Sequence, residues 1–393
     1  MTDIFIVSGV RTAVGTFGGS LKDTPPADLA ATVTREAIAR SGLEAEAVGH
    51  VVFGQVIQTE PRDCYLSRWA AVTAGCRIET PAMNVNRLCG SGLQAVVTAG
   101  QMLKLGEADV AVAGGAEVMS RAPYLLPGAR FGLKMGDAAM VDALTGALTD
   151  PFNRYHMGMT AENVAEAHGV DRAAQDDAAF ESHRRASAAC REGRFVEQIV
   201  PVEVRAKGRT VAFDRDEHIR HDARREDFDA LRPVFRRDGG TVTAGNASGI
   251  NDGAAALVLA TGAEVARSNL TPLARIVSWG HAGVDPAHMG MGPVPATRQA
   301  LERAGLTVAD LDVIESNEAF AAQACAVARA LDFDPARVNP NGSGISIGHP
   351  VGATGAINTV NAAYELRRSG GRHALVTMCI GGGQGIAAIL ERA

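Results

Sequence analysis

The chain has 393 residues, of which 46% are hydrophobic and 21% charged, and its formal net charge is −6. This is the composition of a globular protein long enough for two or three domains, and no stretch reaches the roughly 18 apolar residues of a membrane span. The negative net charge and the lack of a Lys/Arg-rich run argue against a nucleic-acid-binding surface.

The termini and the cysteines predict a cytoplasmic protein. Met1–Val7 runs straight into a strand-like segment without the basic and apolar regions of a secretory signal, and Ile389–Ala393 carries no peroxisomal tripeptide. The six cysteines are scattered and form no CxxC pair, which disfavours a zinc site and suggests a reducing compartment.

Apolar runs alternate with helical patterns through the first part of the chain. We expect strands at Ile4–Val7, His50–Gln55, Ala82–Val85 and Val110–Ala113, and helices at Ala27–Ser41, Leu66–Ala74 and Leu93–Leu105. Strands that alternate with helices indicate an α/β fold.

Parts of this pattern recur later in the same order. Thr34–Leu43 resembles Thr297–Leu306, and each is followed by a short acidic link and a strand, at 51–53 and 313–315. The segment around Cys89-Gly-Ser-Gly resembles that around Asn341-Gly-Ser-Gly, and the strand Val110–Ala113 resembles Ala374–Met378. Three ordered matches indicate an α/β unit duplicated within the chain.

A polar segment from about 120 to 246 separates the two copies. It is rich in charge, Gly, Met and His and poor in long strand signals. We expect a long insertion with little regular structure of its own, of the kind that forms a lid or binding region. For most of its charges, a solvated surface is the simpler interpretation.

Cys89 lies in Asn86-Arg-Leu-Cys-Gly-Ser-Gly-Leu-Gln-Ala95, directly before an expected helix. The free N–H groups and the dipole of a helix N-terminus favour an anion, and the thiolate is the nucleophilic form of cysteine. The alternative is a buried structural cysteine, because free cysteines are often buried.

Three further segments carry reactive or small residues near the expected ends of strands, where α/β sheets bind ligands. They are Asn317-Glu-Ala-Phe320, Asn339–Pro350 with His349, and Cys379-Ile-Gly-Gly-Gly-Gln-Gly385. Gly342–Gly348 lacks the spacing and context of a dinucleotide-binding loop.

Taken together, Asn86–Ala95, Asn317–Phe320, Asn339–Gly355 and Cys379–Gly385 resemble the motifs of the thiolase family, from the first strand to the last residues. The resemblance implies two duplicated βαβαβ-type halves packed as a five-layered α-β-α-β-α core with an inserted loop domain. It divides the chain into an N-terminal half (1–119 plus 247–270), the insertion (120–246) and a C-terminal half (271–393).

The resemblance also implies catalytic roles. Cys89 would be the acyl-accepting nucleophile, His349 its activating base, and Cys379 the acid/base that serves the α-carbon of acetyl-CoA. One oxyanion hole would use the N–H groups of Cys89 and Gly381, and the other His349 with a water held by Asn317. Cys64, Cys76, Cys190 and Cys325 match no catalytic position, and we interpret them as structural.

Coenzyme A would be a substrate, bound at positions that match the family's CoA site: His156, Met157, Arg220, Ala244, Ser248, Ala319 and Phe320. Met157, Met289 and Phe320 would line the acyl pocket. The chain has Asp227 where some acetoacetyl-CoA thiolases have a serine near the adenine, which puts the contacts to the nucleotide end in question.

The expected reaction is thiolysis of a 3-ketoacyl-CoA or its reverse, Claisen condensation of acetyl-CoA with an acyl-CoA. It needs no metal and no bound cofactor, and its setting is either fatty-acid or polyhydroxyalkanoate metabolism. The family implies a homodimer or homotetramer, with 123–135 as a candidate contact. Two alternatives remain: a ketoacyl synthase that uses carrier-protein substrates, and a CoA-binding protein without activity.

Overall fold

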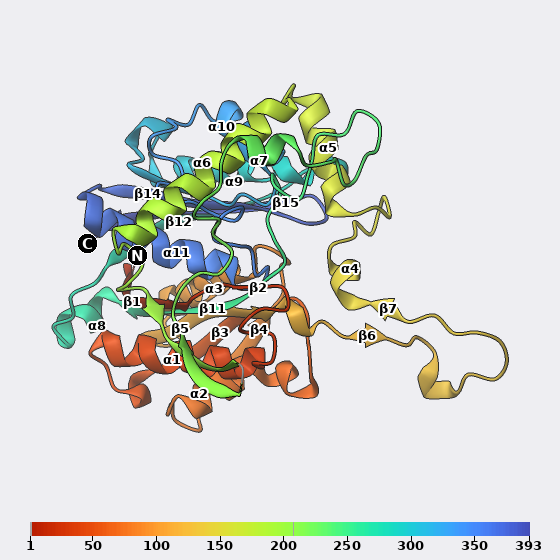
Figure 1. The fold of residues 1–393 in the computed structure, drawn as a ribbon. Helices are drawn as coiled ribbons and strands as arrows, with labels where there is room; N and C mark the ends of the chain where they lie inside the picture. The colour runs from red at the N-terminus through yellow and green to blue at the C-terminus, as the bar shows by residue number, and fades with distance from the viewer. Residues whose placement is uncertain (1, 207) are drawn as a thin grey trace.

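The computed structural model describes residues 2–206 and 208–393. Two α/β halves lie one above the other in Figure 1, with helices outside each sheet and between the sheets. The layers are α1 and α2, the N-terminal sheet, α3 with α11, the C-terminal sheet, and α9 with α10. The five-layered thiolase-like fold expected from the sequence is confirmed.

The N-terminal half contains every strand and helix expected there, within a few residues. Its sheet order is β1-β11-β5-β3-β4, in which β3 pairs in parallel with β4 and β5. The elements are β1 (Ile4–Thr12), α1 (Pro26–Ser41), β3 (His50–Gly54), α2 (Leu66–Thr73), β4 (Ala82–Val85), α3 (Ser91–Lys104), β5 (Val110–Val118) and β11 (Asn251–Thr261), with β2 (Gly15–Thr16) and α8 (Gly262–Arg267) at its edges.

The C-terminal half repeats this arrangement, which supports the duplication inferred from the sequence. Its order is β12-β15-β14-β13, and Val338 bridges Ile314 in parallel as β4 pairs with β3. The elements are β12 (Ala274–Gly283), α9 (Pro293–Ala304), β13 (Val313–Ser316), α10 (Ala321–Ala330), α11 (Thr354–Ser369), β14 (His373–Ile380) and β15 (Gln384–Arg392).

The two halves are joined at two places. β1 pairs with β12 over Ile4–Ile6, which links the strands of both halves into one 11-stranded hydrogen-bonded sheet. Between the layers, α3 and α11 meet through glycines: a Cβ on Gly92 would lie 2.6 Å from the Ala356 nitrogen, and one on Gly355 would lie 2.2 Å from the Leu93 nitrogen. This close crossing brings the N-termini of the two central helices together.

The insertion is more regular than the sequence suggested. It contains α5 (Met157–Ala167) and the 20-residue α6 (Arg172–Arg191), so the expectation of little regular structure is wrong. Both helices start with a side-chain cap, from His156 and from Asp171. The pattern of α6 was missed because charged residues and alanines dominate it, and its buried face is built of small and polar side chains.

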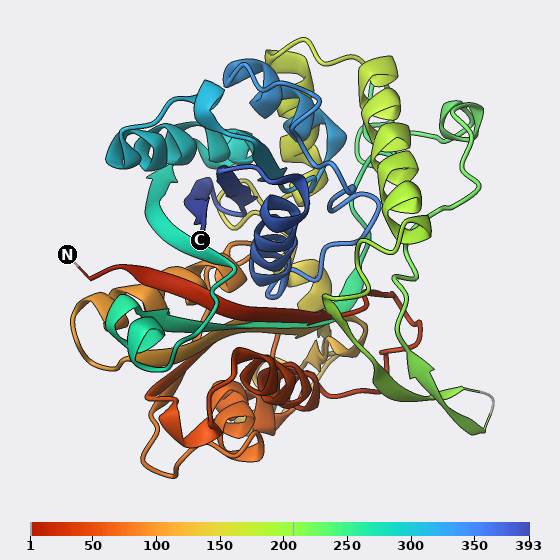
Figure 2. The same cartoon turned by 90° about the vertical axis from the view of Figure 1, so that its left-hand side faces the viewer.

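Short elements complete the insertion. The hairpin of β9 (Val202–Ala206) and β10 (Arg209–Phe213) packs Val202, Val204 and Phe213 against the core of the N-terminal half. The tongue of β6 (Tyr124–Leu125) and β7 (Val141–Asp142) projects from the body, on the right of Figure 1. β8 (Ile199–Val200) joins β1, and α4 (Ala143–Ala147) and α7 (Glu226–Asp229) are brief. Figure 2 shows α6 lying beside loops of the C-terminal half. Within the described residues, no helix is both long and apolar enough to cross a membrane.

Candidate active site

A cavity of about 350 Å³ lies where the two halves and the insertion meet, and most of the residues expected to act together line it. Its wall is almost entirely apolar, as is typical of ligand pockets, with few polar groups to orient a ligand. The predicted site residues on this wall are Cys89, His156, Met157, Ala244, Ser248, Met289, Ala319, Phe320, His349 and Gly381.

Cys89 lies between β4 and α3, on a tight turn. Leu88 has a φ of 46°, a left-handed conformation that is unfavourable for a leucine. The turn is held by the Asn86 side chain, which accepts the Leu88 N–H at 3.0 Å, and by the Ser91 hydroxyl, which donates to the Leu88 carbonyl at 2.7 Å. The strained backbone presents the Cys89 thiol to the cavity just before the helix N-cap, Gly90.

The resting state of Cys89 is a thiol. Burial raises the pKa of Cys89 to about 11, although the N–H groups of Gly381 and of Cys89 itself lie beside the sulfur and act in the opposite direction. The helix N-terminus therefore does not suffice to ionise this cysteine, and a base is required. The same two N–H groups would also stabilise an oxyanion formed next to the sulfur.

His349 has the properties of that base. Burial lowers the pKa of His349 to about 4, so its imidazole is neutral near pH 7. The backbone N–H of His349 donates to the Asn251 side chain at 2.9 Å, and the ring Nδ1 lies 2.7 Å from the Thr354 hydroxyl. Gly348 precedes it with a φ of 114°, and a Cβ there would lie 2.6 Å from the Asn251 side chain, so only glycine fits this position.

Asn317 and Cys379 are buried behind the wall. Asn317 follows β13 directly, and its Nδ2 lies 3.4 Å from the His349 Nε2. Its Oδ1 has no hydrogen-bond partner among the described residues. Cys379 is in β14, two residues before Gly381, and its pKa is raised by burial and by the neighbouring Cys89. The second thiol is therefore close to the first.

The wall on the insertion side holds the residues expected to contact CoA. His156 caps α5 by accepting the Gly158 N–H on its Nδ1, which leaves Nε2 as a donor, and its ring stacks on Phe235 at 4.7 Å. The Ser248 N–H donates to the Ala319 carbonyl at 2.9 Å, and Ala247 bridges Phe320. The 241–250 loop thus lies against the C-terminal half.

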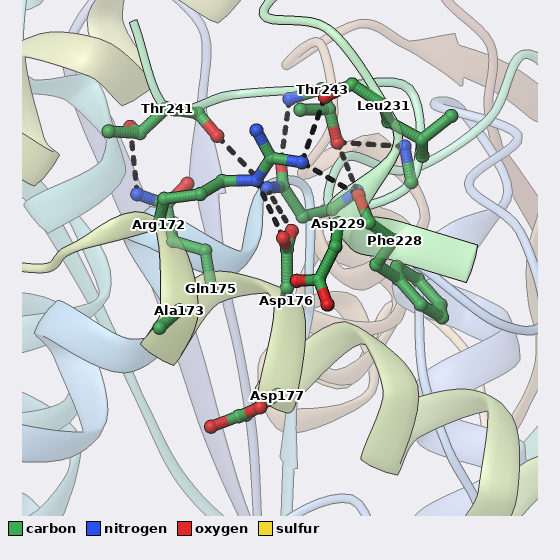
Figure 3. Close-up of polar contacts among 12 residues, drawn as sticks. Arg172, Ala173, Gln175, Asp176, Asp177, Phe228, Asp229, Leu231, Thr241 and Thr243 are labelled. Carbon is green, nitrogen blue, oxygen red and sulfur yellow. Dashed lines mark hydrogen bonds and ion pairs between the residues drawn. The ribbon is translucent and has the colours of Figure 1, made fainter. Parts of the chain in front are cut away.

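The first turn of α6 holds this loop in place, as Figure 3 shows. Arg172 donates to the carbonyls of Phe228 and Leu231 at 2.7 and 2.9 Å and pairs with Asp176 at 2.6 Å. Asp176 in turn accepts from Asn246 at 2.8 Å. These charge-assisted bonds fix the residues on either side of Val234 and Phe235, which line the cavity.

Arg220 is the one predicted CoA residue that lies apart from the cavity lining. It is exposed, and its backbone N–H donates to His183 at 3.1 Å. Asp227, the noted departure from the family, pairs with Arg224 at 2.9 Å, and these hydrogen bonds lower the pKa of Asp227. Of the four remaining cysteines, Cys64 is exposed and Cys76 is buried.

Sequence reasoning missed the residues that orient the site. Asn251 and Thr354 hold His349, Phe235 stacks on His156, and Glu117 lies under the site. Asn251, Phe235 and Glu117 contact segments far apart in the chain, so no local pattern indicates them. Thr354 lies only five residues after His349, inside the motif that was noted, and its role was overlooked. In the ranges 2–206 and 208–393, no group of three or more His, Cys, Asp or Glu side chains is placed to hold a metal ion.

Comparison with known proteins agrees with this geometry. The thiolase N-terminal domain model matches residues 4–263, and the thiolase C-terminal domain model matches residues 270–392. The Beta-ketothiolase BktB of Cupriavidus necator is 66% identical over 390 residues, which is 99% of each chain. An acetyl-CoA acetyltransferase of the same organism is 49% identical over 394 residues, covering both chains fully.

Solved structures show the same likeness. The crystal structure of human mitochondrial 3-ketoacyl-CoA thiolase superposes with a TM-score of 0.97 at 44% identity, covering 100% of this chain and 99% of that one. The acetyl-CoA acetyltransferase of Bacillus anthracis gives a TM-score of 0.97 at 43% identity, with the same coverage. Because the family models match both halves and these relatives match over the full length, the chain belongs to the thiolase family.

Proposed function

We propose that the protein is an acyltransferase that catalyses the reversible thiolase reaction through an acyl group carried on Cys89. The observation that carries the proposal is the arrangement of a thiol and a neutral imidazole on one apolar cavity, with a second thiol buried behind its wall and close to the first. A binding protein needs none of this reactivity. Nucleophilic catalysis needs the first thiol and a base, and proton transfer at the α-carbon of acetyl-CoA needs a further acid/base such as the second thiol.

In the degradative direction, Cys89 gives its proton to His349 and attacks the keto carbon of a 3-ketoacyl-CoA. The bond between the α- and β-carbons breaks, and Cys379 protonates the departing carbanion to give acetyl-CoA. A second CoA then gives its thiol proton to the Cys379 thiolate and takes the acyl group, and the departing Cys89 thiolate recovers its proton from His349. The synthetic direction reverses each step, so ping-pong kinetics are expected.

The oxyanions of these steps have two candidate binding places. The N–H groups of Cys89 and Gly381 lie beside the Cys89 sulfur and would stabilise the tetrahedral intermediate at the acyl group. His349 and Asn317, in contact with each other, would stabilise the enolate of acetyl-CoA, with a water held by Asn317. Both roles are proposals that rest on the positions of these groups.

We place coenzyme A along the insertion side of the cavity, as a substrate. The Nε2 of His156 and the hydroxyl of Ser248 are available to bond the pantetheine arm, with Met157, Ala244, Ala319 and Phe320 as apolar contacts. Arg220, exposed and outside the cavity, would act on the charged nucleotide end. Because the two thiols and the imidazole supply nucleophile, acid and base, the reaction should need neither metal nor bound cofactor, and activity should survive exhaustive dialysis against EDTA.

Cysteine substitutions test the chemistry. With radiolabelled acetyl-CoA, the wild type should retain a covalent acetyl group, Cys89→Ala should not, and Cys64→Ala, at an exposed thiol away from the cavity, should behave as wild type. Cys379→Ala should still acylate Cys89 but lose the carbon–carbon bond formation. Equal labelling of the wild type and Cys89→Ala would refute the nucleophile, and near-normal condensation in Cys379→Ala would remove the second thiol from the mechanism.

The substrate preference is the finer part of the proposal. We infer a short-chain β-ketothiolase of fatty-acid or polyhydroxyalkanoate metabolism, because the cavity is apolar but closed in by Met157, Met289 and Phe320. Rates on 3-ketoacyl-CoAs of four to eight carbons would define the chain length. Turnover of acyl-carrier-protein thioesters instead of CoA thioesters would favour a ketoacyl synthase, and absence of any turnover a binding protein.

We also propose a cytoplasmic homodimer or homotetramer. Six free cysteines fit a reducing compartment, and the tongue that contains 123–135 exposes apolar side chains suited to contact another copy. The division of the chain into an N-terminal half (1–119 plus 247–270), an insertion (120–246) and a C-terminal half (271–393) remains a prediction. Cell fractionation and the mass of the native assembly would test location and oligomeric state separately.

A further inference from the structure

Glu117 is a carboxyl group buried beneath the active site. It lies near the end of β5, is fully inaccessible, and has no ion-pair partner among the described residues. Burial raises its pKa to about 8, against the effect of the N–H groups that bind it. An unpaired buried carboxylate is costly, so its retention calls for a structural or chemical role.

Its hydrogen bonds join the two halves of the site. Oε2 accepts the N–H groups of Val56 and Gly352, each at 2.9 Å, and Oε1 accepts that of Ile57 at 3.1 Å. Val56 follows β3 in the half that carries Cys89, whereas Gly352 belongs to the loop of His349 in the other half. One oxygen atom therefore ties both halves together.

The loop at Gly352 is tightly packed against β5. A Cβ on Gly115 would lie 2.3 Å from the Gly352 carbonyl oxygen, and one on Gly352 itself would lie 2.4 Å from the Glu117 Oε2. The same loop carries His349 three residues before and Thr354, which bonds the His349 ring, two residues after. Fixing Gly352 thus fixes both the base and the group that orients it.

We propose that Glu117 is a positioning residue: its carboxylate holds the His349 loop in register with the half of the site that carries Cys89. The inference rests on the proposed function, because it concerns how the base reaches the nucleophile. Glu117 does not line the cavity and holds the backbone through its hydrogen bonds with Val56, Ile57 and Gly352.

The charge of Glu117 offers a readout that a merely structural role would not move. The nearby Asp63 raises the pKa of Glu117. The negative charge of Glu117 in turn raises the pKa of Cys89. Cys89 also shares the cavity wall with His349 and lies near Cys379. Since the pKa of Glu117 is about 8 and that of Cys89 about 11, Glu117 is ionised in the pH range in which Cys89 loses its proton. Removing the charge while keeping the hydrogen bonds to Val56 and Gly352 should therefore make the thiolate easier to form.

Three variants separate these effects. Glu117→Gln keeps one acceptor oxygen for Val56 and Gly352 and loses the charge, whereas Glu117→Ala loses both. Glu162→Gln is the matched control, since Glu162 is a buried carboxyl that accepts the N–H groups of Thr241 and Val242 at 2.9 to 3.0 Å on the insertion side. It should lose a comparable amount of stability without acting on Cys89.

Two measurements test the role of Glu117. At saturating acetyl-CoA, Glu117→Ala should acylate Cys89 about a hundredfold more slowly, the loss that a displacement of about 1 Å brings, with Glu117→Gln partly rescuing the rate. The pH midpoint for iodoacetamide alkylation of the Cys89 peptide, followed by mass spectrometry, should fall in Glu117→Gln and stay unchanged in Glu162→Gln.

A midpoint that stays or rises in Glu117→Gln, or a folded Glu117→Ala that acylates at the wild-type rate, would overturn the inference. Should Glu117→Ala fail to fold, the comparison of the two Gln variants decides alone. If the wild type itself forms no acyl-enzyme, the proposed function fails, and the alkylation midpoints still report whether Glu117 acts on Cys89.

Discussion

The tautomer of His349 follows from its neighbours. The Thr354 hydroxyl donates to the Pro350 carbonyl at 2.9 Å, so it can only accept from the His349 Nδ1, which must carry the proton. Nε2 is then free to accept, and it faces the amide of Asn317. Thr354 thereby selects the tautomer whose lone pair points toward the reacting groups, as a base requires.

Replacing the Thr354 hydroxyl should slow acylation of Cys89 while the other residues of the site stay in place. In Thr354→Val the ring loses its acceptor, and we expect acylation of Cys89 to fall about tenfold to a hundredfold, part of the roughly 10²–10⁴ that general base catalysis contributes. Thr359→Val is the control, because Thr359 lies on the same helix and donates only to the Gly355 carbonyl. Single-turnover mass spectrometry measures the rate, and equal rates in both variants would contradict this role.

At the residue scale, the sequence identified the candidate reactive residues that share the cavity but not most of the residues that hold them in place. Cys89, His349 and Gly381 stand in short motifs whose glycines are visible in the chain, and the structure places all three on one cavity. Asn251 contacts His349 across 98 positions, and Glu117 contacts Gly352 across 235. Such partners are set by tertiary packing, so a single sequence without neighbours in space does not identify them.

At the scale of elements, α6 explains why a polar insertion forms an ordered wall. Its face toward the protein buries Asp176, Ser182 and His183 rather than large apolar side chains. These polar groups are satisfied by hydrogen bonds to loops, Asp176 to Asn246 and Ser182 to Glu318. A search for apolar periodicity therefore overlooks α6, because its packing depends on hydrogen bonds that only the fold provides.

The network in Figure 3 predicts a specific defect in substrate binding. Arg172→Ala removes the donors to Phe228 and Leu231, so the loop that carries Phe235 loses its support. We expect KM for acetyl-CoA to rise about tenfold, equivalent to about 1.4 kcal/mol, with little change in iodoacetamide alkylation of Cys89. Arg184→Ala, on the same helix but paired with Glu181 at the exposed surface, should leave KM unchanged. A rise of equal size in both variants would exclude a local effect.

At the scale of the whole molecule, a duplicated fold supports one asymmetric site. The position that matches Cys89 in the second half is Asn341, whose side chain bonds Glu365 at 2.9 Å and Arg194 at 2.8 Å and is buried. The first half therefore contributes Cys89, the proposed nucleophile, and the second contributes His349 and Cys379. The repeat was visible in the sequence, but the pairing of β1 with β12 that joins the halves was not, because it depends on register between distant strands.

The tongue carries large apolar side chains that the fold of a single chain leaves exposed. It leaves the body in Figure 1, and its side chains Phe131 and Met135 are 88% and 99% exposed. Contiguous exposed apolar surface of this kind marks a protein contact, and a second copy of the chain is the partner proposed above.

Polar substitutions in the tongue should therefore weaken assembly and spare the fold. In the double variant Phe131→Ser with Met135→Ser, we expect a lower native mass by light scattering and an unchanged circular dichroism spectrum, since substitutions at exposed positions change the stability of the single chain by only about 0.5 kcal/mol. Val196→Ser, at a position 73% exposed in another loop, should keep the wild-type mass. Both substituted side chains lie in the tongue, so an unchanged mass in the double variant would show that the tongue is not an assembly contact.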